Sequence, residues 1–158
     1  MIKFPKKVGV AADHAGFELK EYLKKMLLEA KYEIIDFGDN ELNSTDDYPD
    51  YIIPLAHAIA NGNIARGIAI CGSGVGACIT ANKVAGVRAC LIHEKFSAKQ
   101  GVEDDDMNMI CLGGNLIDRS FAWELTSIFL TAKFIPAERH VRRLAKVAEL
   151  ENTKNLKH

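Results

Sequence analysis

The sequence predicts a doubly wound, Rossmann-like α/β sandwich built on a five-stranded parallel sheet. Three observations support this class. Short apolar runs alternate along the chain with longer segments of helical periodicity. The apolar runs are nearly continuous, as in parallel strands that are covered on both faces. The third run leads through a glycine-rich turn directly into a helical pattern. Right-handed crossovers between such strands place helices on both sides of the sheet, which gives three layers.

The strands are identified by their apolar runs. In chain order these are KVGVAA (7–12), YEIIDF (32–37), GIAIC (67–71), VRACLI (87–92) and MNMICL (107–112). The segments between and after them are expected to be helical, at 16–30, 50–61, from the glycine loop to about 85, briefly after 92, and at 118–133 and about 137–151. In the first helix the apolar positions recur at helical spacing, at Phe17, Leu19, Leu23, Met26, Leu27 and Ala30. No linker or repeat divides the chain, so residues 1–158 are expected to form a single domain.

Composition narrows the classes of partner. The 158 residues include 20 basic and 21 acidic ones, for a net charge of −1, which argues against nucleic acid or an anionic membrane as a partner of the whole surface. No apolar run approaches the roughly 18 residues of a membrane span. The start MIKFPKK lacks the apolar core of a signal peptide. A cytoplasmic location is therefore the default expectation.

Four cysteines occur, and none of them suggests a metal site. There is no C-x-x-C pair, and no histidine lies at zinc-ligand spacing beside a cysteine. Cys78, Cys90 and Cys111 are interpreted as small buried apolar residues in a reducing compartment. Cys71 differs, because it ends the third predicted strand immediately before the glycine loop.

In parallel α/β sheets, ligands bind beyond the carboxyl ends of the strands. The candidate segments are therefore those that follow the strands: DHAG (13–16), DFGD (36–39), CGSGVG (71–76), HEK (93–95) and GGN (113–115).

The glycine loop at 72–76 has three interpretations. Gly72, Gly74 and Ala77 fit a dinucleotide-binding pattern, with Glu94 near the end of the next strand. That pattern usually follows the first strand, however, and the extra Gly76 leaves more bare amides than a dinucleotide turn needs. A tight turn without a ligand is the second interpretation. The third, an anion-binding loop, is favoured because successive amides lead into a helix N-terminus.

The position of Cys71 beside this loop suggests acid–base chemistry. The field of the amides and of the helix favours the thiolate form of a cysteine. A thiolate next to amides that bind an oxyanion can attack a carbonyl, or it can remove a proton from the neighbouring carbon. Nucleophilic attack normally requires a nearby histidine to shuttle protons. Proton abstraction with stabilisation of an enediolate requires only the base and the amides.

Two further segments carry candidate ligands. Asp13 and His14 follow the first strand and directly precede a helix. In one interpretation Asp13 caps the helix and His14 is an incidental surface residue. In the other, the pair binds a hydroxyl and the phosphate of a substrate. Arg139 and Arg143 lie one helical turn apart, nearly opposite an apolar face that consists of Val141, Leu144, Ala145 and Ala148. The arginines form either a solvated basic face or a phosphate clamp. Because they point away from the chain's own core, a clamp would serve a partner subunit.

Together these segments resemble one family, ribose-5-phosphate isomerase B and the related galactose-6-phosphate isomerase subunits. The resemblance covers residues from about 6 to 150, through ADHAGFELK, DDYPDY, GIAICGSGVGACITANKVAGVRA, SA at 97–98, MNMICLGGN and ERHVRRL. It implies interconversion of aldose and ketose phosphates through a cis-enediolate, without metal or organic cofactor.

The resemblance also implies roles for individual residues. Cys71 is the base that moves the proton between C1 and C2. The enediolate oxygens are held by the amides around Gly72, Ser73, Gly74, Val75 and Gly76. The sugar is lined by Asp13, His14 and Tyr48, and the phosphate is held by Arg139 and Arg143.

The chain departs from the best-known members of the family at two places. Asp104 and Asp105 stand where many members have a His-Asn pair whose histidine opens the furanose ring. Asn115 stands where many have an arginine that helps to bind phosphate. Asp104 could accept the anomeric proton, with Asp105 and Asn115 as further substrate ligands; the alternative is that EDDD (103–106) is a solvated turn. The departures leave open whether the sugar is a ribose, galactose, allose or tetrose phosphate.

The position of EDDD bears on assembly. These residues precede the fifth strand, so they are expected at the sheet edge opposite Cys71 and could reach a site only across a subunit contact. With the outward-facing arginines they predict a symmetric homodimer, or a tetramer, with shared sites. The competing class is a non-catalytic module that binds a phosphosugar or dinucleotide, in which Cys71 is merely buried.

Overall fold

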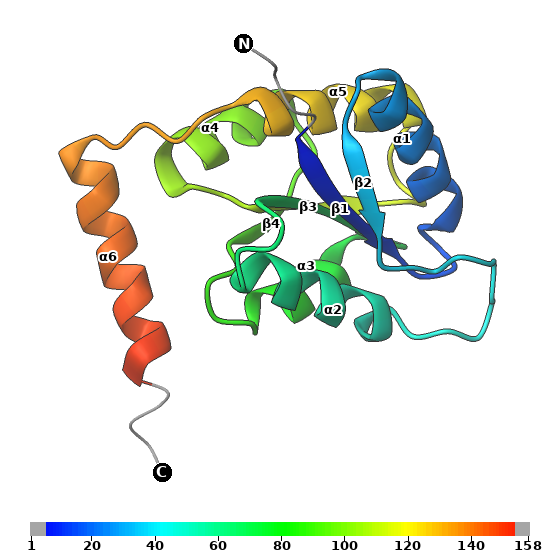
Figure 1. The fold of residues 1–158 in the computed structure, drawn as a ribbon, viewed down its shortest axis with the longest axis horizontal. Coiled ribbons are helices and arrows are strands. Elements are labelled where there is room, and N and C mark those ends of the chain that lie inside the picture. The colour runs from blue at the N-terminus through cyan, green and yellow to red at the C-terminus, as the bar shows by residue number, and fades with distance from the viewer. Residues whose placement is uncertain (1–5, 154–158) are drawn as a thin grey trace.

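The structure, a computed structural model that describes residues 6–153, contains one all-parallel sheet of five strands in the order β2-β1-β3-β5-β4 (Figure 1). The strands are β1 (Lys7–Ala12), β2 (Glu33–Asp36), β3 (Arg66–Cys71), β4 (Ala89–Leu91) and β5 (Met109–Gly113). The helices are α1 (Phe17–Glu29), α2 (Pro49–Ala60), α3 (Val75–Asn82), α4 (Lys95–Asp105), α5 (Arg119–Thr131) and α6 (Glu138–Thr153). The predicted doubly wound α/β sandwich is confirmed.

Alternation along the strands produces two apolar layers, one on each face of the sheet. Val8 and Val10 of β1 belong to the layer beneath α1, α4 and α5, whereas Ala11 belongs to the layer beneath α2 and α3. In β3 the same alternation assigns Ile70 to the first layer and Cys71 to the second. Figure 1 shows these two groups of helices on opposite sides of the sheet. Cys71 therefore ends its strand on the side of α2 and α3.

The strand order determines which loops meet. The chain leaves β1 toward β2 on one side and then returns to build β3, β5 and β4 on the other, so the order reverses between β1 and β3. Loops diverge at such a switch point, and the crevice that they leave is where ligands bind in open α/β sheets. Because β5 lies between β3 and the edge strand β4, the loop after β5 becomes the second neighbour of the glycine loop.

The region of α4 differs from the expected short helix. Its first turn is capped by Glu94, whose carboxylate accepts hydrogen bonds from the Ser97 amide at 3.0 Å. The helix continues through Asp105 and ends where Asp106 adopts the left-handed conformation with φ 49°. EDDD is therefore the last helical turn of α4 and its cap, and β5 begins at Met109 instead of 107.

Helix α6 stands apart from the sandwich (Figure 1). Its N-terminal end is held by the His140 side chain, which is 2% exposed and lies 3.3 Å from Asp104 through Nε2 and Oδ1. Near its C-terminal end, Glu151 accepts a hydrogen bond from the Gly86 amide at 3.0 Å. Between these ends Val141 and Val147 are each half exposed. The apolar face of α6 is thus not packed against its own core as the sequence pattern suggested, and both of its faces border open space.

Among residues 6–153, no helix has both the length and the apolar character that crossing a membrane requires.

A buried ion pair joins α1 to the end of β2. The Lys20 side chain is fully buried, and its Nζ donates to both carboxylate oxygens of Asp36, at 2.9 and 2.7 Å. Lys24 adds a second contact to Asp36 at 2.7 Å. Burial alone would raise the pKa of Asp36, but the hydrogen bonds from both lysines outweigh burial and lower it.

We predict that Asp36→Ala lowers the free energy of unfolding by about 3 kcal/mol, because the buried Lys20 keeps only the half-exposed Glu21 carboxylate, 3.2 Å from its Nζ, as a counter-charge. Urea unfolding at neutral pH measures this loss. A matched control is Glu33→Ala at the other end of β2, which breaks the exposed Lys7–Glu33 pair of 3.6 Å and should cost less than about 1 kcal/mol. Because its folded-state pKa is depressed, Asp36 stabilises the fold above its unfolded pKa, and this contribution is lost as the pH falls through the folded value. Equal losses for the two variants would contradict the assignment.

Candidate active site

The turn after β1 forms one wall of the site. Parallel pairing sets Ala12 opposite Ile70, so residues 13–16 emerge beside the end of β3. Asp13 is only 6% exposed, and its Oδ1 accepts a hydrogen bond from the Gly16 amide at 3.2 Å. Burial raises the pKa of Asp13 although the Gly16 amide opposes the shift. The helix-cap interpretation of Asp13 is wrong, because Gly16 is the N-cap of α1 and no side chain caps this helix; Asp13 instead closes the turn that precedes it.

Cys71 lies at the floor of the site, where β3 turns into α3. The residue is 4% exposed, and the Gly74 amide donates a hydrogen bond to its Sγ at 3.2 Å. Gly74 has φ +81°, and a side chain there would press on the Leu112 backbone at 2.9 Å. Only glycine fits this position, because it combines the left-handed conformation with contact to a neighbouring strand. The loop therefore delivers an amide directly to the sulfur.

The loop after β5 supports the glycine loop from behind. The Gly114 amide donates to the Cys71 carbonyl at 2.8 Å, and the Asn115 amide donates to the Gly72 carbonyl at 3.0 Å. A Cβ on Gly114 would lie 2.6 Å from the Ala15 carbonyl oxygen, so the turns after β1 and β5 also touch. The side chain of Asn115 packs over Gly72. The loops after β1, β3 and β5 thus form one continuous surface.

Tyr48 reaches the same surface from the start of α2. Its ring lies so close to the Gly76 backbone that a Cβ on Gly76 would be 2.5 Å from Cζ. Tyr48 remains 37% exposed and borders the open side of the loop. The structure thus brings together Asp13, His14, Tyr48, the loop at 71–76 and Asn115, all of which were candidates from the sequence.

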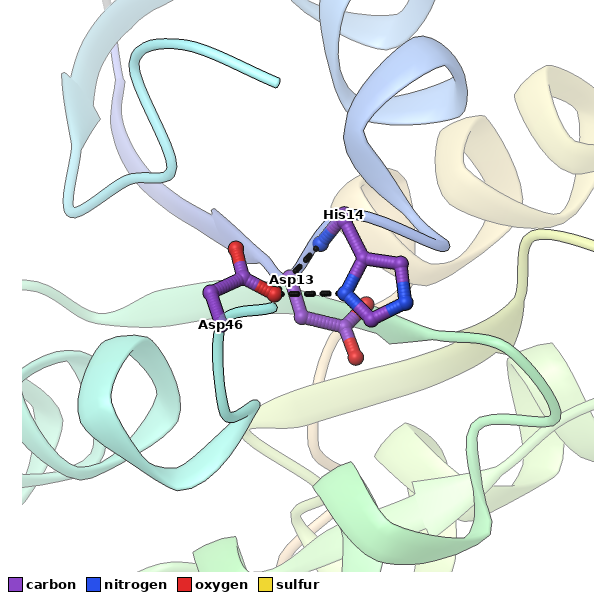
Figure 2. Close-up of side chains that lie close together, drawn as sticks. All are labelled: Asp13, His14 and Asp46. Atoms are coloured by element: carbon purple, nitrogen blue, oxygen red, sulfur yellow. Dashed lines mark hydrogen bonds and ion pairs between the residues drawn. The ribbon is translucent and has the colours of Figure 1, made fainter. Parts of the chain in front are cut away.

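His14 is held by a partner that sequence reasoning missed. Asp46, in the loop before α2, accepts from the His14 backbone amide at 3.0 Å and lies 2.6 Å from its Nδ1 (Figure 2). The hydrogen bond with Asp46 raises the pKa of His14 even though desolvation opposes it. Burial would raise the pKa of Asp46, but hydrogen bonds from the His14 ring and amide lower it. The DDYPDY segment marks Asp46 as part of a family motif, but nothing local pairs it with a histidine 32 residues away in the sequence.

A cavity of about 420 Å³ opens beside His14. Its walls come from the turn after β1, from α1, and from the segment between β5 and α5, and they include Glu18, Asn115, Asp118 and Arg119. Arg119 was not a candidate from the sequence, although it closely follows the GGN segment. Its guanidinium lies 3.3 Å from Glu18, and both side chains are largely exposed.

The remaining candidates lie elsewhere in the chain. Asp104 accepts a hydrogen bond from Gln100 at 2.9 Å and faces His140, and Asp105 lines a second cavity of about 480 Å³ between β4, α4 and α6. Arg139 and Arg143 are exposed on α6. The chain's own fold does not bring these four residues to Cys71.

The other cysteines are only partly as expected. Cys111 is buried, and Cys78 is half buried with its pKa lowered to about 6, chiefly by a hydrogen bond with Cys111. The expectation of a buried thiol is wrong for Cys90, which is exposed because β4 is a short edge strand that borders the second cavity. Glu94, which a dinucleotide site would place on a ribose, instead caps α4.

The assembled groups match proton transfer next to a carbonyl. A thiol lies beside amide donors at a helix N-terminus, which stabilise negative charge as it develops on oxygen. A histidine with a raised pKa stands at the adjacent cavity and can meet an anion. These features define a doubly wound α/β protein whose site at the carboxyl ends of the strands suits an anionic carbonyl compound.

Comparison with known proteins identifies the family. The model of the Ribose/Galactose Isomerase family matches residues 8–147, and the chain belongs to this family. It is 40% identical to the Bacillus subtilis protein named "Putative sugar phosphate isomerase YwlF", over 95% of this chain and 99% of that one. It is 35% identical to D-erythrulose-4-phosphate isomerase of Pectobacterium atrosepticum, over 80% and 84% of the two chains.

A solved structure agrees with both sequence and fold. Ribose-5-phosphate isomerase B of Mycoplasma genitalium, with bound ribulose 5-phosphate, superposes with a TM-score of 0.88. The two proteins are 33% identical, and the match covers 95% of this chain and 99% of that one.

We predict that Gly74→Ala destabilises the fold more than Gly62→Ala does. Both glycines have positive φ, so each alanine costs about 1–2 kcal/mol. Gly62 has open space around it, whereas the Gly74 variant adds a clash worth roughly 1–3 kcal/mol. The Gly74 variant should also slow alkylation of Cys71 by iodoacetamide, followed by peptide mass spectrometry, because the amide moves off the sulfur. Equal destabilisation and unchanged alkylation would show that the loop does not depend on this contact.

Proposed function

We propose that the protein interconverts an aldose phosphate and a ketose phosphate, with ribose 5-phosphate and ribulose 5-phosphate as the first pair to test. The observation that carries the proposal is the Gly74 amide directed at the sulfur of Cys71, where the glycine loop leads into the N-terminus of α3. Family membership and the ligand of the Mycoplasma genitalium structure support this choice of substrate class.

In the proposed reaction, Cys71 acts as the base on the open-chain sugar. The thiolate takes the proton from C2 of the aldose, and the C2–H electron pair forms the C1–C2 double bond of a cis-enediolate. Negative charge develops on the former carbonyl oxygen, where the amides of residues 72–76 stabilise it. The Cys71 thiol then returns its proton to C1, the O2 hydroxyl proton passes to O1, and C2 becomes the carbonyl carbon of the ketose. No other reactant is consumed.

The remaining side chains of the surface bind the substrate in this proposal. Asp13 and Tyr48 flank the glycine loop and contact sugar hydroxyls. His14 meets the phosphate from the cavity that it lines together with Asn115. Because Asn115 is neutral, the positive charge that binds the phosphate comes from His14 and from Arg139 and Arg143 of a second copy of the chain.

The other half of the proposed site comes from a second copy of the chain. A symmetric dimer would cover the half-exposed Val141 and Val147 of α6 and carry Arg139 and Arg143 to the neighbouring site. In that arrangement the partner also supplies Asp104, as the acceptor of the anomeric proton, and Asp105. Whether two such dimers associate further into a tetramer, and the cytoplasmic location, stay predictions.

A tetrose phosphate is the second candidate substrate. The similarity to D-erythrulose-4-phosphate isomerase favours it, together with Asp104 at the position where ring-opening relatives carry histidine. A phosphorylated tetrose cannot close a furanose ring, so it does not require an efficient ring-opening group.

We predict that the wild-type protein turns over at least one member of a panel of ribose, allose, galactose and erythrose phosphates, and that Cys71→Ala is folded but about 10²–10⁴-fold slower. Initial rates and circular dichroism measure the two properties. Cys90→Ala is the matched control and should keep full activity, because Cys90 lies at the edge strand. A Cys71→Ala variant that kept more than about a tenth of the rate would exclude Cys71 as the base.

We predict that Cys71→Ala and Arg143→Ala chains restore activity to each other in mixed dimers, assayed at a substrate concentration below the KM of Arg143→Ala. Arg143→Ala should weaken binding of the sugar phosphate by about 1.5–3 kcal/mol, and Cys71→Ala removes the base. In a mixed dimer one site carries both defects and the other carries none, so random mixing should recover about one quarter of the wild-type activity. Refolding the mixed chains and verifying heterodimers by mass spectrometry precedes the rate measurement. The absence of recovery in verified heterodimers would refute shared sites.

A further inference from the structure

Asp46 makes two contacts to one residue across a long stretch of sequence. A single oxygen, Oδ1, accepts from the His14 backbone amide and lies 2.6 Å from the ring Nδ1. The two contacts fix the position of the main chain and the orientation of the ring together. Figure 2 shows the consequence, in which Nδ1 faces Asp46 and the other ring nitrogen, Nε2, points away from it.

This arrangement is costly for Asp46. Its side chain is 3% exposed, and its second oxygen, Oδ2, is buried without a hydrogen-bond partner within the described structure. Asp39, within hydrogen-bonding reach of Asp46, also has a buried Oδ2 without a partner. Buried carboxylates are normally fully paired, because leaving their oxygens unsatisfied costs free energy. Asp46 also faces Asp39 and the Tyr51 hydroxyl, but its Oδ1 is committed to both the amide and the ring of His14, which indicates a role in setting the state of that histidine.

We propose that Asp46 is a positioning residue that keeps His14 protonated, so that its Nε2–H donates to the phosphate of the substrate. The inference rests on the proposed function, and it adds a residue and a pH dependence to it. With Nδ1–H committed to Asp46, neutral His14 offers only a lone pair at Nε2, which repels a phosphate oxygen. Protonated His14 offers an N–H and a positive charge at the same position.

Within this chain, the surroundings of His14 are mostly acidic. Asp13 lies on the same turn, Glu18 and Asp118 line the cavity from α1 and from the start of α5, and Asp39 stands behind Asp46. The cation among the cavity-lining residues of this chain is Arg119, which is paired with Glu18. A doubly charged phosphate would therefore meet mostly negative charge unless His14 carried its proton. Asp46 and Asp13 both favour protonation of His14, and Asp46 does so through the shortest contact.

Asp13, His14 and Asp46 also place one potential metal ligand each within 4.8 Å of one another. The Nδ1 and Oδ1 atoms satisfy each other at 2.6 Å, and a metal ion would have to break that contact. The geometry thus favours an ion pair.

The first experiment is an NMR titration of the histidine ring signals in the wild-type protein, Asp46→Asn and Glu41→Gln. His14→Gln identifies the His14 signal. In the wild type, His14 should titrate above its ordinary value of 6.5. Asp46→Asn retains an acceptor for both contacts but loses the charge, so the pKa of His14 should fall. Glu41→Gln removes an equal charge from an exposed position of the same loop and should leave it unchanged.

The second experiment compares steady-state kinetics at several pH values. Near neutral pH, Asp46→Asn should raise KM for the sugar phosphate about fivefold relative to wild type, the difference between a charged and a neutral hydrogen bond, with little change in kcat. The KM ratio of the two proteins cancels the titration of the substrate's own phosphate. It should approach one at mildly acidic pH, where His14 is protonated in both. In a His14→Gln background, adding Asp46→Asn should leave KM unchanged.

The outcomes separate the two proposals. Lack of turnover of every sugar phosphate by the wild type would refute the proposed function. The titration would still decide the present inference, with ribose 5-phosphate added as the probe of the His14 signal. A wild-type His14 that titrates at or below 6.5, or that does not respond to this probe, overturns the inference. So does an Asp46→Asn effect that persists in the His14→Gln background, because it would then be merely structural. If Asp46→Asn does not fold, the wild-type titration alone decides.

Discussion

Two backbone hydrogen bonds between neighbouring loops hold the centre of this site. The amides of Gly114 and Asn115, just after β5, donate to the carbonyls of Cys71 and Gly72, just after β3. They extend the β3–β5 ladder beyond the end of the sheet and hold the sulfur-bearing turn against a second strand. Such bonds are available only because β5 lies between β3 and β4. A sheet with β4 in that place would put a different loop behind Cys71.

The close packing of the loops requires glycine at several of their positions. The turns after β1, β3 and β5 approach one another so closely that side chains do not fit between them. A Cβ on Gly74 or Gly114 would lie within 3 Å of a neighbouring backbone. The close approach keeps the loop after Cys71 nearly free of side chains, so that amides other than those of Gly74 and Val75, which donate to Cys71 Sγ and Ser73 Oγ, can face a ligand. It also explains why the sequence is rich in glycine on both sides of the crevice. The same feature that permits the packing thereby supplies the donors that the proposed enediolate requires.

Charges are balanced in the core but not at the site. Lys20 and Asp36 pair in the interior, where each neutralises the other and contributes to the stability of the fold. At the crevice, carboxylates outnumber the cations that this chain provides, and His14 gains its positive character from Asp46. The site of a single chain is therefore poorly suited to bind an anion. On the proposed function, the arginines of α6 in a partner complete the charge balance, and the exposed face of α6 is consistent with such a contact.

The sequence alone determined the strand–helix alternation, the parallel sheet, and the identity of the segments at its carboxyl edge. These features are local, because apolar periodicity reports burial and glycine reports turn geometry within a few residues. Three of the five predicted edge segments, DHAG, CGSGVG and GGN, accordingly meet in the structure, together with Tyr48. The tertiary structure decided what periodicity does not encode: the place of β5 in the sheet, the exposure of Cys90 on the edge strand, the helical state of residues 103–105, and the separation of α6 from the core. It alone brought Asp46 to His14, since that contact depends on how a polar loop closes over the sheet, and loop closure is set by the whole fold and not by the residues of the loop.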